Sequence, residues 1–119
     1  MTRLLGPDFI SLQVDDLDTA RHFYTERLGL VPAPHSPPGA IVFQTQPIAF
    51  AVRTLLAETA SVRAAGVALW FACDDVDGLH ARLAAQGVPI VTAPAAGPFG
   101  RFFTLSDPFG YTLTAHQAA

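Results

Sequence analysis

The chain has 119 residues, half of them apolar and only 14% charged, with a formal net charge of −3. This acidic balance argues against a nucleic-acid partner, and no run of basic residues offers a patch for a membrane surface. No stretch is apolar for long enough to cross a bilayer, and the first residues lack the apolar core of a signal peptide. We therefore expect a cytoplasmic protein whose residues 1–119 form a single domain.

The first quarter of the chain predicts a strand, a helix and a second strand. Phe9–Val14 alternates between two faces, and only one of these is aliphatic throughout, as in a half-buried strand. Apolar residues at helical spacing over Leu17–Leu28 predict a helix, which Asp16 would cap and Gly29 would end. A short strand over Leu30–Pro34 is expected to follow.

The same order of elements recurs in the second half of the chain, so the sequence predicts a duplicated unit. Asp74 and Asp75 repeat the paired aspartates at the helix start, and Gly87 repeats the glycine at the helix end. The remaining elements predicted for the first copy are a loop over His35–Gly39 and strands over Ala40–Gln44 and Ile48–Arg53. Those predicted for the second are strands over Val67–Cys73, Val88–Thr92, Arg101–Ser106 and Tyr111–His116, a helix over Val76–Gln86, a loop over Ala93–Gly100 and a turn over Asp107–Gly110.

Three motifs give this plan a family resemblance: VDDLDTARHFYTERLGL in the first half, and CDDVDGLHARLAAQGV and LSDPFGYTLTAH in the second. Together they resemble the vicinal-oxygen-chelate superfamily, which contains glyoxalase I, the extradiol dioxygenases, and fosfomycin- and bleomycin-resistance proteins. The resemblance implies an α+β fold of two tandem βαβββ modules, at about residues 8–53 and 67–116, joined by a connector over 54–66. The modules would form a curled mixed sheet, shaped as a cup, with the helices on its outer face.

Enzymes of that superfamily bind a divalent metal, and the resemblance places the ligand positions at Phe9, Ala68 and Thr114 in this sequence. Phenylalanine and alanine cannot bind a metal, and a lone threonine hydroxyl is a poor ligand. We therefore expect no metal and no other cofactor, as in a metal-free branch similar to the bleomycin-resistance proteins. A displaced site built from Gln13 and His116 remains the alternative.

Strand alternation, counted from these positions, predicts which residues line the cup. The expected walls are apolar and aromatic with a few polar groups, which is the composition of a small-molecule pocket. A bulge in the strand over residues 101–106 would exchange Phe102 and Thr104 for Arg101 and Phe103. The predicted ligand-binding residues are Phe9, Ser11, Gln13, Phe50, Trp70, Phe102, Thr104, Thr114 and His116.

Three functions are compatible with this pattern. The first is metal-independent binding of a small hydrophobic or aromatic molecule, including resistance by sequestration. The second is a divergent lyase, isomerase or dioxygenase in which His116 acts as general base, assisted by Gln13 or Thr114. The third is a structural or regulatory dimer whose cup is filled by side chains. The high apolar fraction favours a homodimer in each case.

Overall fold

The computed structural model describes residues 2–55 and 66–117. The chain divides into two compact units, Met1–Ser61 and Val62–Ala119. Most of the connector predicted between the modules, residues 56–65, lies outside the described residues.

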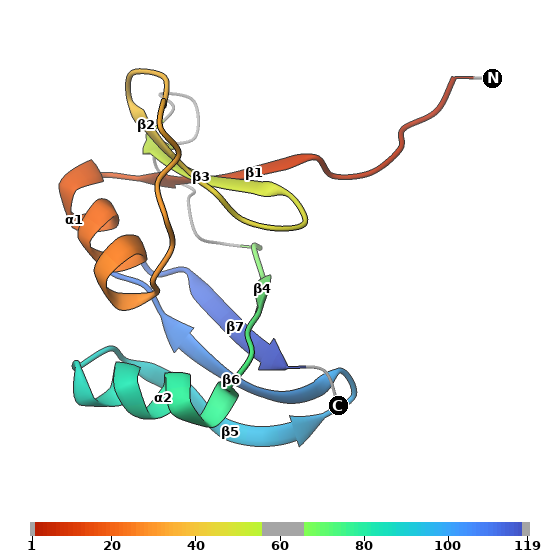
Figure 1. Cartoon of the computed structure of the whole chain (residues 1–119), viewed down its shortest axis with the longest axis vertical. Helices are drawn as coiled ribbons and strands as arrows, with labels where there is room; N and C mark the ends of the chain where they lie inside the picture. The colour runs from red at the N-terminus through yellow and green to blue at the C-terminus, as the bar shows by residue number, and fades with distance from the viewer. Residues whose placement is uncertain (1, 56–65, 118–119) are drawn as a thin grey trace. The chain divides into compact units, whose positions relative to one another are not determined.

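The first unit has one three-stranded mixed sheet and one helical segment (Figure 1). The strands lie in the order β1-β3-β2, with β1 parallel and β2 antiparallel to β3. A π-helix, η1, continues α1 without a break, so the single predicted helix forms with two hydrogen-bonding patterns. The elements are β1 (Phe9–Val14), α1 (Leu17–Arg21), η1 (His22–Arg27), β2 (Ala40–Phe43) and β3 (Ala49–Thr54).

The second unit repeats the plan with one strand more. Its sheet has the order β4-β7-β6-β5, in which β4 is parallel to β7 and the other pairs are antiparallel (Figure 1). The elements are β4 (Leu69–Ala72), α2 (Val76–Ala85), β5 (Ile90–Gly97), β6 (Gly100–Ser106) and β7 (Thr112–Gln117). The predicted α+β fold with two mixed sheets is confirmed, whereas the curled cup, which depends on both sheets together, stays a prediction.

The predicted helix starts are confirmed in both units. The Asp16 carboxylate accepts hydrogen bonds from the backbone N–H groups of Asp18 and Thr19, at 3.0 and 3.2 Å. Hydrogen bonds from the backbone and side chain of Thr19 hold the pKa of Asp16 below its usual value. Asp75 likewise accepts from the N–H of Gly78 at 3.0 Å. These aspartates satisfy N–H groups that have no partner within the helix, so their role is structural.

The helix ends are also as predicted. Gly29 and Gly87 follow the two helical segments with φ angles of 78° and 80°, in the left-handed region where a Cβ would be strained. None of the helices in the described residues is long and apolar enough to span a membrane.

Aromatic side chains fill the core of the first unit on the helix side of its sheet. The ring of Tyr24, from η1, lies 5.9 Å from that of Phe43 and 5.4 Å from that of Phe50. The expectation that Phe50 lines the opposite face is therefore wrong. Phe50 pairs with Ile10 on the neighbouring strand, and paired residues point to the same side of a sheet. Ile10 belongs to the aliphatic face of β1, which packs towards the helix.

Two predicted boundaries also differ from the structure. Leu30–Pro34 forms only an isolated bridge between Pro32 and Phe43, because proline has no N–H to extend a ladder. The loop predicted over Ala93–Gly100 is mostly strand, since β5 continues to Gly97. Shifts in the pairing of β5 with β6 accommodate this irregular stretch, which contains a proline.

Candidate functional site

Helix α2 covers one face of the second sheet, where it packs against β5, β6 and β7. Phe103, Leu105 and Leu113 are buried on this side. The imidazole of His80, on α2, lies 5.4 Å from the ring of Phe103. Because strand side chains alternate, the residues between these point to the other side, which we call the helix-free face of the second sheet.

Five of the nine predicted site residues meet on the helix-free face. Trp70 on β4 and Thr104 on β6 both pair with Thr114 on the strand between them, and Phe102 pairs with His116. No bulge interrupts β6 in this register, so Arg101 and Phe103 point the other way. The structure thus brings together five residues from the stretch 70–116. Their contact with a ligand stays a prediction.

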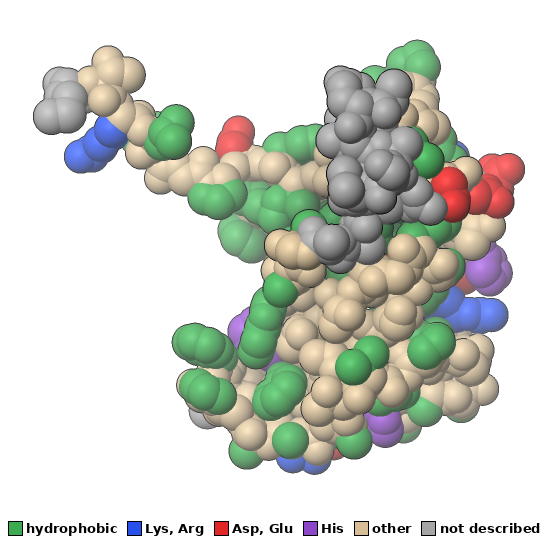
Figure 2. All heavy atoms as spheres, turned by 180° about the vertical axis from the view of Figure 1, so that it is seen from behind, with side chains coloured by type: hydrophobic (Ala, Val, Ile, Leu, Met, Phe, Trp, Pro, Cys, Tyr) green, Lys and Arg blue, Asp and Glu red, His purple; other side chains and the backbone are tan. Residues whose placement is uncertain are grey.

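Aromatic rings gather at one end of this face. The indole of Trp70 lies 5.9 Å from the rings of Phe99 and Phe102 and 5.4 Å from the imidazole of His116. We call these four side chains the aromatic corner. Trp70 remains 47% exposed and Phe99 68% exposed, although they pack against each other. Hydrophobic side chains are visible at the end of the second unit where the β5–β6 hairpin turns (Figure 2).

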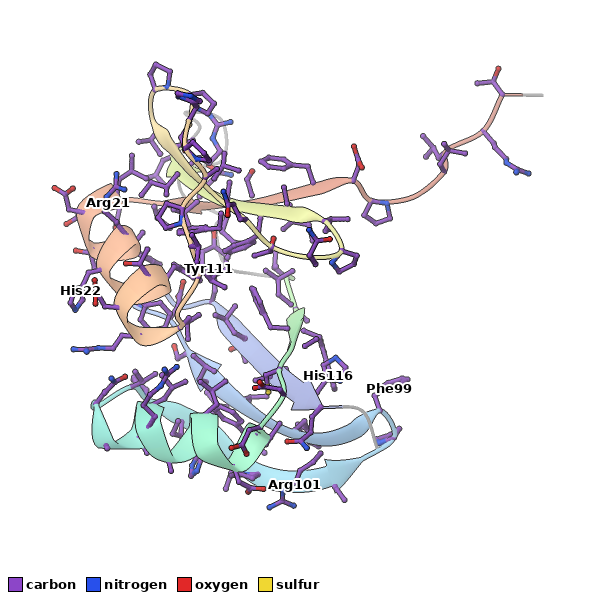
Figure 3. The ribbon with its side chains drawn as sticks, viewed as in Figure 1. Arg21, His22, Phe99, Arg101, Tyr111 and His116 are labelled. Atoms are coloured by element: carbon purple, nitrogen blue, oxygen red, sulfur yellow. The ribbon has the colours of Figure 1, made fainter. Side chains whose placement is uncertain are left out.

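Phe99 was not predicted from the sequence. It lies at the tip of the hairpin that joins β5 and β6, close to His116, whereas Arg101 points away from both (Figure 3). Alternation assigns faces only within strands, so it cannot orient a turn residue. The available signal was an aromatic residue between Pro98 and Gly100, two residues that favour a tight turn.

The imidazole of His116 is attached to this turn. Its Nδ1 lies 3.3 Å from the carbonyl oxygen of Phe99. A carbonyl oxygen only accepts, so Nδ1 carries the proton and donates it. In the neutral ring, Nε2 then keeps a free lone pair and can accept a hydrogen bond or a proton.

Hydroxyl groups adjoin the aromatic corner across three strands. Thr92, Thr104 and Thr114 lie side by side in the register of β5, β6 and β7. Among the residues that the structure describes, the Thr104 Oγ1 is the buried side-chain polar atom without a hydrogen-bond partner. A buried hydroxyl left unpaired costs about 1–3 kcal/mol, so this atom favours any ligand that supplies a partner.

The charged side chains among residues 66–117 lie away from the aromatic corner. Arg101 makes two hydrogen bonds to the Asp77 carboxylate on α2, at 2.8 and 2.9 Å. This pairing lowers the pKa of Asp77 and raises that of Arg101. Asp107 is buried in the β6–β7 turn and accepts hydrogen bonds from the N–H groups of Phe109 and Tyr111. The aromatic corner thus has no charged neighbour on its own face among residues 66–117, His116 aside.

Three of the other predicted site residues, on β1, lie in the first unit. Phe9, Ser11 and Gln13 occupy the side of β1 away from the aliphatic residues that pack towards the helix. Phe9 is 52% exposed, Ser11 is exposed and Gln13 is partly buried. On this side they neighbour two alanines and Arg53 of β3. These three do not form an aromatic cluster within the unit.

The metal-ligand positions that the family resemblance implies do not fit a metal here. Phe9 and Ala68 offer no donor atom, and Thr114 lies beside Trp70 and Thr104, which are not metal ligands either. Among residues 2–55 and 66–117, no three His, Cys, Asp or Glu side chains are grouped to hold an ion. Burial raises the pKa of the Cys73 thiol, and Asp74 and Asp75 add to this, which disfavours a reactive thiolate.

Two mixed sheets are built from a repeated strand–helix–strand unit, and the second carries an aromatic cluster on the face opposite its helix. The model of the Glyoxalase/Bleomycin resistance protein/Dioxygenase superfamily matches residues 6–114. The chain therefore belongs to this superfamily. This agrees with the resemblance seen in the sequence, although it does not identify the metal-free branch.

Solved structures support the same fold. An antibiotic-binding protein from Streptomyces sp. CB03234, TnmS3, is 22% identical, with a TM-score of 0.81 and all of both chains covered. A glyoxalase/bleomycin resistance protein from the same organism is 24% identical over 94% of this chain and 100% of the other, with a TM-score of 0.76. A lactoylglutathione lyase from Agrobacterium tumefaciens is 22% identical over 98% and 96% of the chains, with a TM-score of 0.71. No curated protein sequence matches this chain.

Proposed function

We propose that the protein binds a small hydrophobic or aromatic molecule without a metal ion, and that it acts by sequestering this molecule. The observation that carries the proposal is the aromatic corner, in which Trp70 stays half exposed on the sheet face opposite α2. Exposed rings held by neighbouring rings are ready to stack on a planar ligand, because little side-chain freedom is lost on binding.

The structural neighbours support a binding role in general terms. They include an antibiotic-binding protein and a lyase, so the scaffold serves both binding and catalysis. In this chain, the residues at the family's metal-ligand positions favour the first of these. Sequestration-type resistance is the form of binding that needs no further chemistry.

The test combines metal analysis with a binding titration. Protein purified without chelator should contain less than stoichiometric zinc, nickel, manganese and iron. Bleomycin and uncharged polycyclic aromatics should be screened by the emission of Trp70, the single tryptophan of the chain. We expect at least one compound to quench or shift this emission with saturation.

A matched pair of variants identifies the site. Phe99→Ala removes a ring from the aromatic corner, whereas Phe109→Ala removes one from the turn at the other end of β6. Only the first should weaken binding. A stoichiometric metal, or equal effects of the two variants, would contradict the proposal. Failure of every compound to bind would favour the structural or regulatory dimer.

One observation favours an enzyme as the second candidate. The Phe99 carbonyl holds the Nδ1 side of His116, which leaves Nε2 able to act as general base. His116→Phe would keep a ring in the aromatic corner but could not take a proton. Turnover of methylglyoxal with glutathione, of catechols or of epoxides by the wild type, lost in this variant with binding retained, would establish catalysis.

We also propose that the protein is a cytoplasmic homodimer. Light scattering at micromolar concentration should then give about twice the chain mass of 12.6 kDa. A particle of the single-chain mass would contradict the dimer and leave the binding proposal unaffected.

A further inference from the structure

The helix-free face of the second sheet has two chemically different halves. The aromatic corner lies at the end where β5 turns into β6. Thr92, Thr104 and Thr114 form the next same-face row beside Phe102 and His116, and Trp70 lies at the β4 end of this row, in register with Thr114. Successive same-face residues are about 7 Å apart and neighbouring strands about 5 Å, so a molecule of two or three fused rings spans both halves.

The Thr104 hydroxyl is the buried polar group on this face that lacks a hydrogen-bond partner among the described residues. Its Oγ1 is buried and makes no hydrogen bond to the described residues. The residue as a whole is only partly buried. Rotation about the Cα–Cβ bond moves the hydroxyl to another staggered position, so a ligand group on the same face can meet it.

The charges of the unit limit what that ligand group can be. Six charged side chains lie in residues 66–117, and none of them occupies a strand position of the helix-free face. Asp74, Asp75, Asp77 and Arg82 lie at the start of α2 or on it, Arg101 is bonded to Asp77 towards the helix, and Asp107 is buried in a turn. His116 apart, the described residues of this face offer no counter-charge to a charged ligand group, which would still lose water on binding.

We propose that this face takes a planar aromatic molecule that carries an uncharged hydrogen-bonding group, such as a hydroxyl, which pairs with Thr104 while the rings lie against the aromatic corner. This rests on the proposed function and deepens it by naming the ligand class. The aromatic corner supplies affinity for many rings. The threonine hydroxyl supplies the preference among them.

Three naphthalenes of similar size test the proposal in an NMR titration that follows the indole N–H signal of Trp70. They are 2-naphthalenemethanol, 2-methylnaphthalene, which lacks the hydroxyl, and 2-naphthoate, which carries a charge. We expect the alcohol to bind about fivefold more tightly than the methyl compound, as one neutral hydrogen bond allows, and the anion to bind less tightly than the alcohol.

Variants then assign the preference to one hydroxyl. Thr104→Val keeps the shape of the side chain and should abolish the difference between alcohol and methyl compound, while Thr104→Ser should retain it. Thr112→Val is the matched control, because Thr112 lies on the same face of β7, one same-face step beyond Thr114. This control should discriminate as the wild type does.

The outcomes separate the two proposals. Equal affinities of wild-type protein for alcohol and methyl compound, with the Trp70 signal shifting for both, would overturn the ligand class and leave the binding function. Discrimination that survives Thr104→Val would also overturn it. The wild-type comparison stands even if that variant does not fold. No shift of the Trp70 signal with any of the three would count against the binding function itself.

Discussion

The main aromatic clusters of the two units lie on different sides of their sheets relative to the helix. In the first, Tyr24, Phe43 and Phe50 pack together on the helix side and are buried. In the second, Trp70 and Phe102 lie on the face that the helix leaves free, and Trp70 is half exposed. One set of rings builds a core, whereas in the other Trp70 and Phe99 keep much of their surface exposed.

This difference shows which part of a duplicated unit is fixed and which is free to change. The aspartates at the helix starts, the glycines at the helix ends and the order of the central strands recur in both units. The residues on the helix-free faces do not recur. Hydrogen bonds and backbone geometry constrain the residues at the helix ends, so these stay the same in both copies. The residues on the helix-free face are less constrained, so that face can acquire a function after duplication.

The largest effect should come from the core of the first unit. Phe50→Ala removes a ring that contacts two others and leaves a cavity, so the free energy of unfolding should fall by about 3–5 kcal/mol. Denaturant unfolding measures this. Phe9→Ala on the neighbouring strand is the control, since Phe9 is half exposed and should cost far less. Equal losses would mean that the faces of β1 and β3 are assigned wrongly.

Trp70→Ala, unlike Phe50→Ala, should weaken ligand binding and leave stability largely intact. Binding of an aromatic ligand should weaken by about 1–3 kcal/mol, because the indole is a central wall of the aromatic corner. Stability should change much less than in Phe50→Ala, because nearly half of the indole surface is already exposed. Calorimetric titration and a melting curve on this variant separate the two effects. A large loss of stability with unchanged affinity would identify Trp70 as a core residue.

The repeated glycines should behave alike in the two units. Gly29→Ala and Gly87→Ala place a Cβ in left-handed backbone, with no other atom within 4 Å of it, so strain alone acts. Each change should lower the free energy of unfolding by about 1–2 kcal/mol. Similar losses in denaturant unfolding would support a common scaffold. A loss confined to one unit would show that the two helix ends are not equivalent.

The smallest effect should be the pH dependence of the ion pair between Asp77 and Arg101. The hydrogen bond from Arg101 lowers the folded-state pKa of Asp77, so the unfolded chain takes up this proton first as pH falls. The stabilisation is complete above the ordinary carboxyl pKa and is lost as pH falls through the lowered one. Asp77→Asn should slightly reduce the melting temperature near neutral pH and not at low pH. Both side chains are partly exposed, so salt should weaken the effect.

The sequence predicted the elements that depend on local rules. Asp16, Asp75, Gly29 and Gly87 mark helix ends through hydrogen bonds and backbone angles that involve only near neighbours. Alternation counted from Ala68 also put Trp70 on the opposite face of the strand from Leu69 and Phe71, and in the structure Trp70 lies on the helix-free face. Such features need no knowledge of distant contacts.

The sequence did not give the positions of Phe50 and Phe99, because these depend on contacts between segments that are distant in the chain. In the stretch that contains Phe50, both sides of the strand carry apolar residues, so alternation alone cannot tell which side faces the helix; the pairing with Ile10 does. Phe99 lies in a turn, where no face is defined in advance. Its place beside Trp70 follows from the path of the β5–β6 hairpin.

The hydrogen bond between His116 and the hairpin turn has a consequence for how this protein can evolve. Its acceptor is the main-chain oxygen of residue 99, which any amino acid at that position retains. The side chain at this position can therefore be exchanged while the turn keeps its link to β7. Mutation at one codon can reshape the aromatic corner, and with it any ligand preference of the proposed binding face, while the hairpin that carries it stays attached to β7.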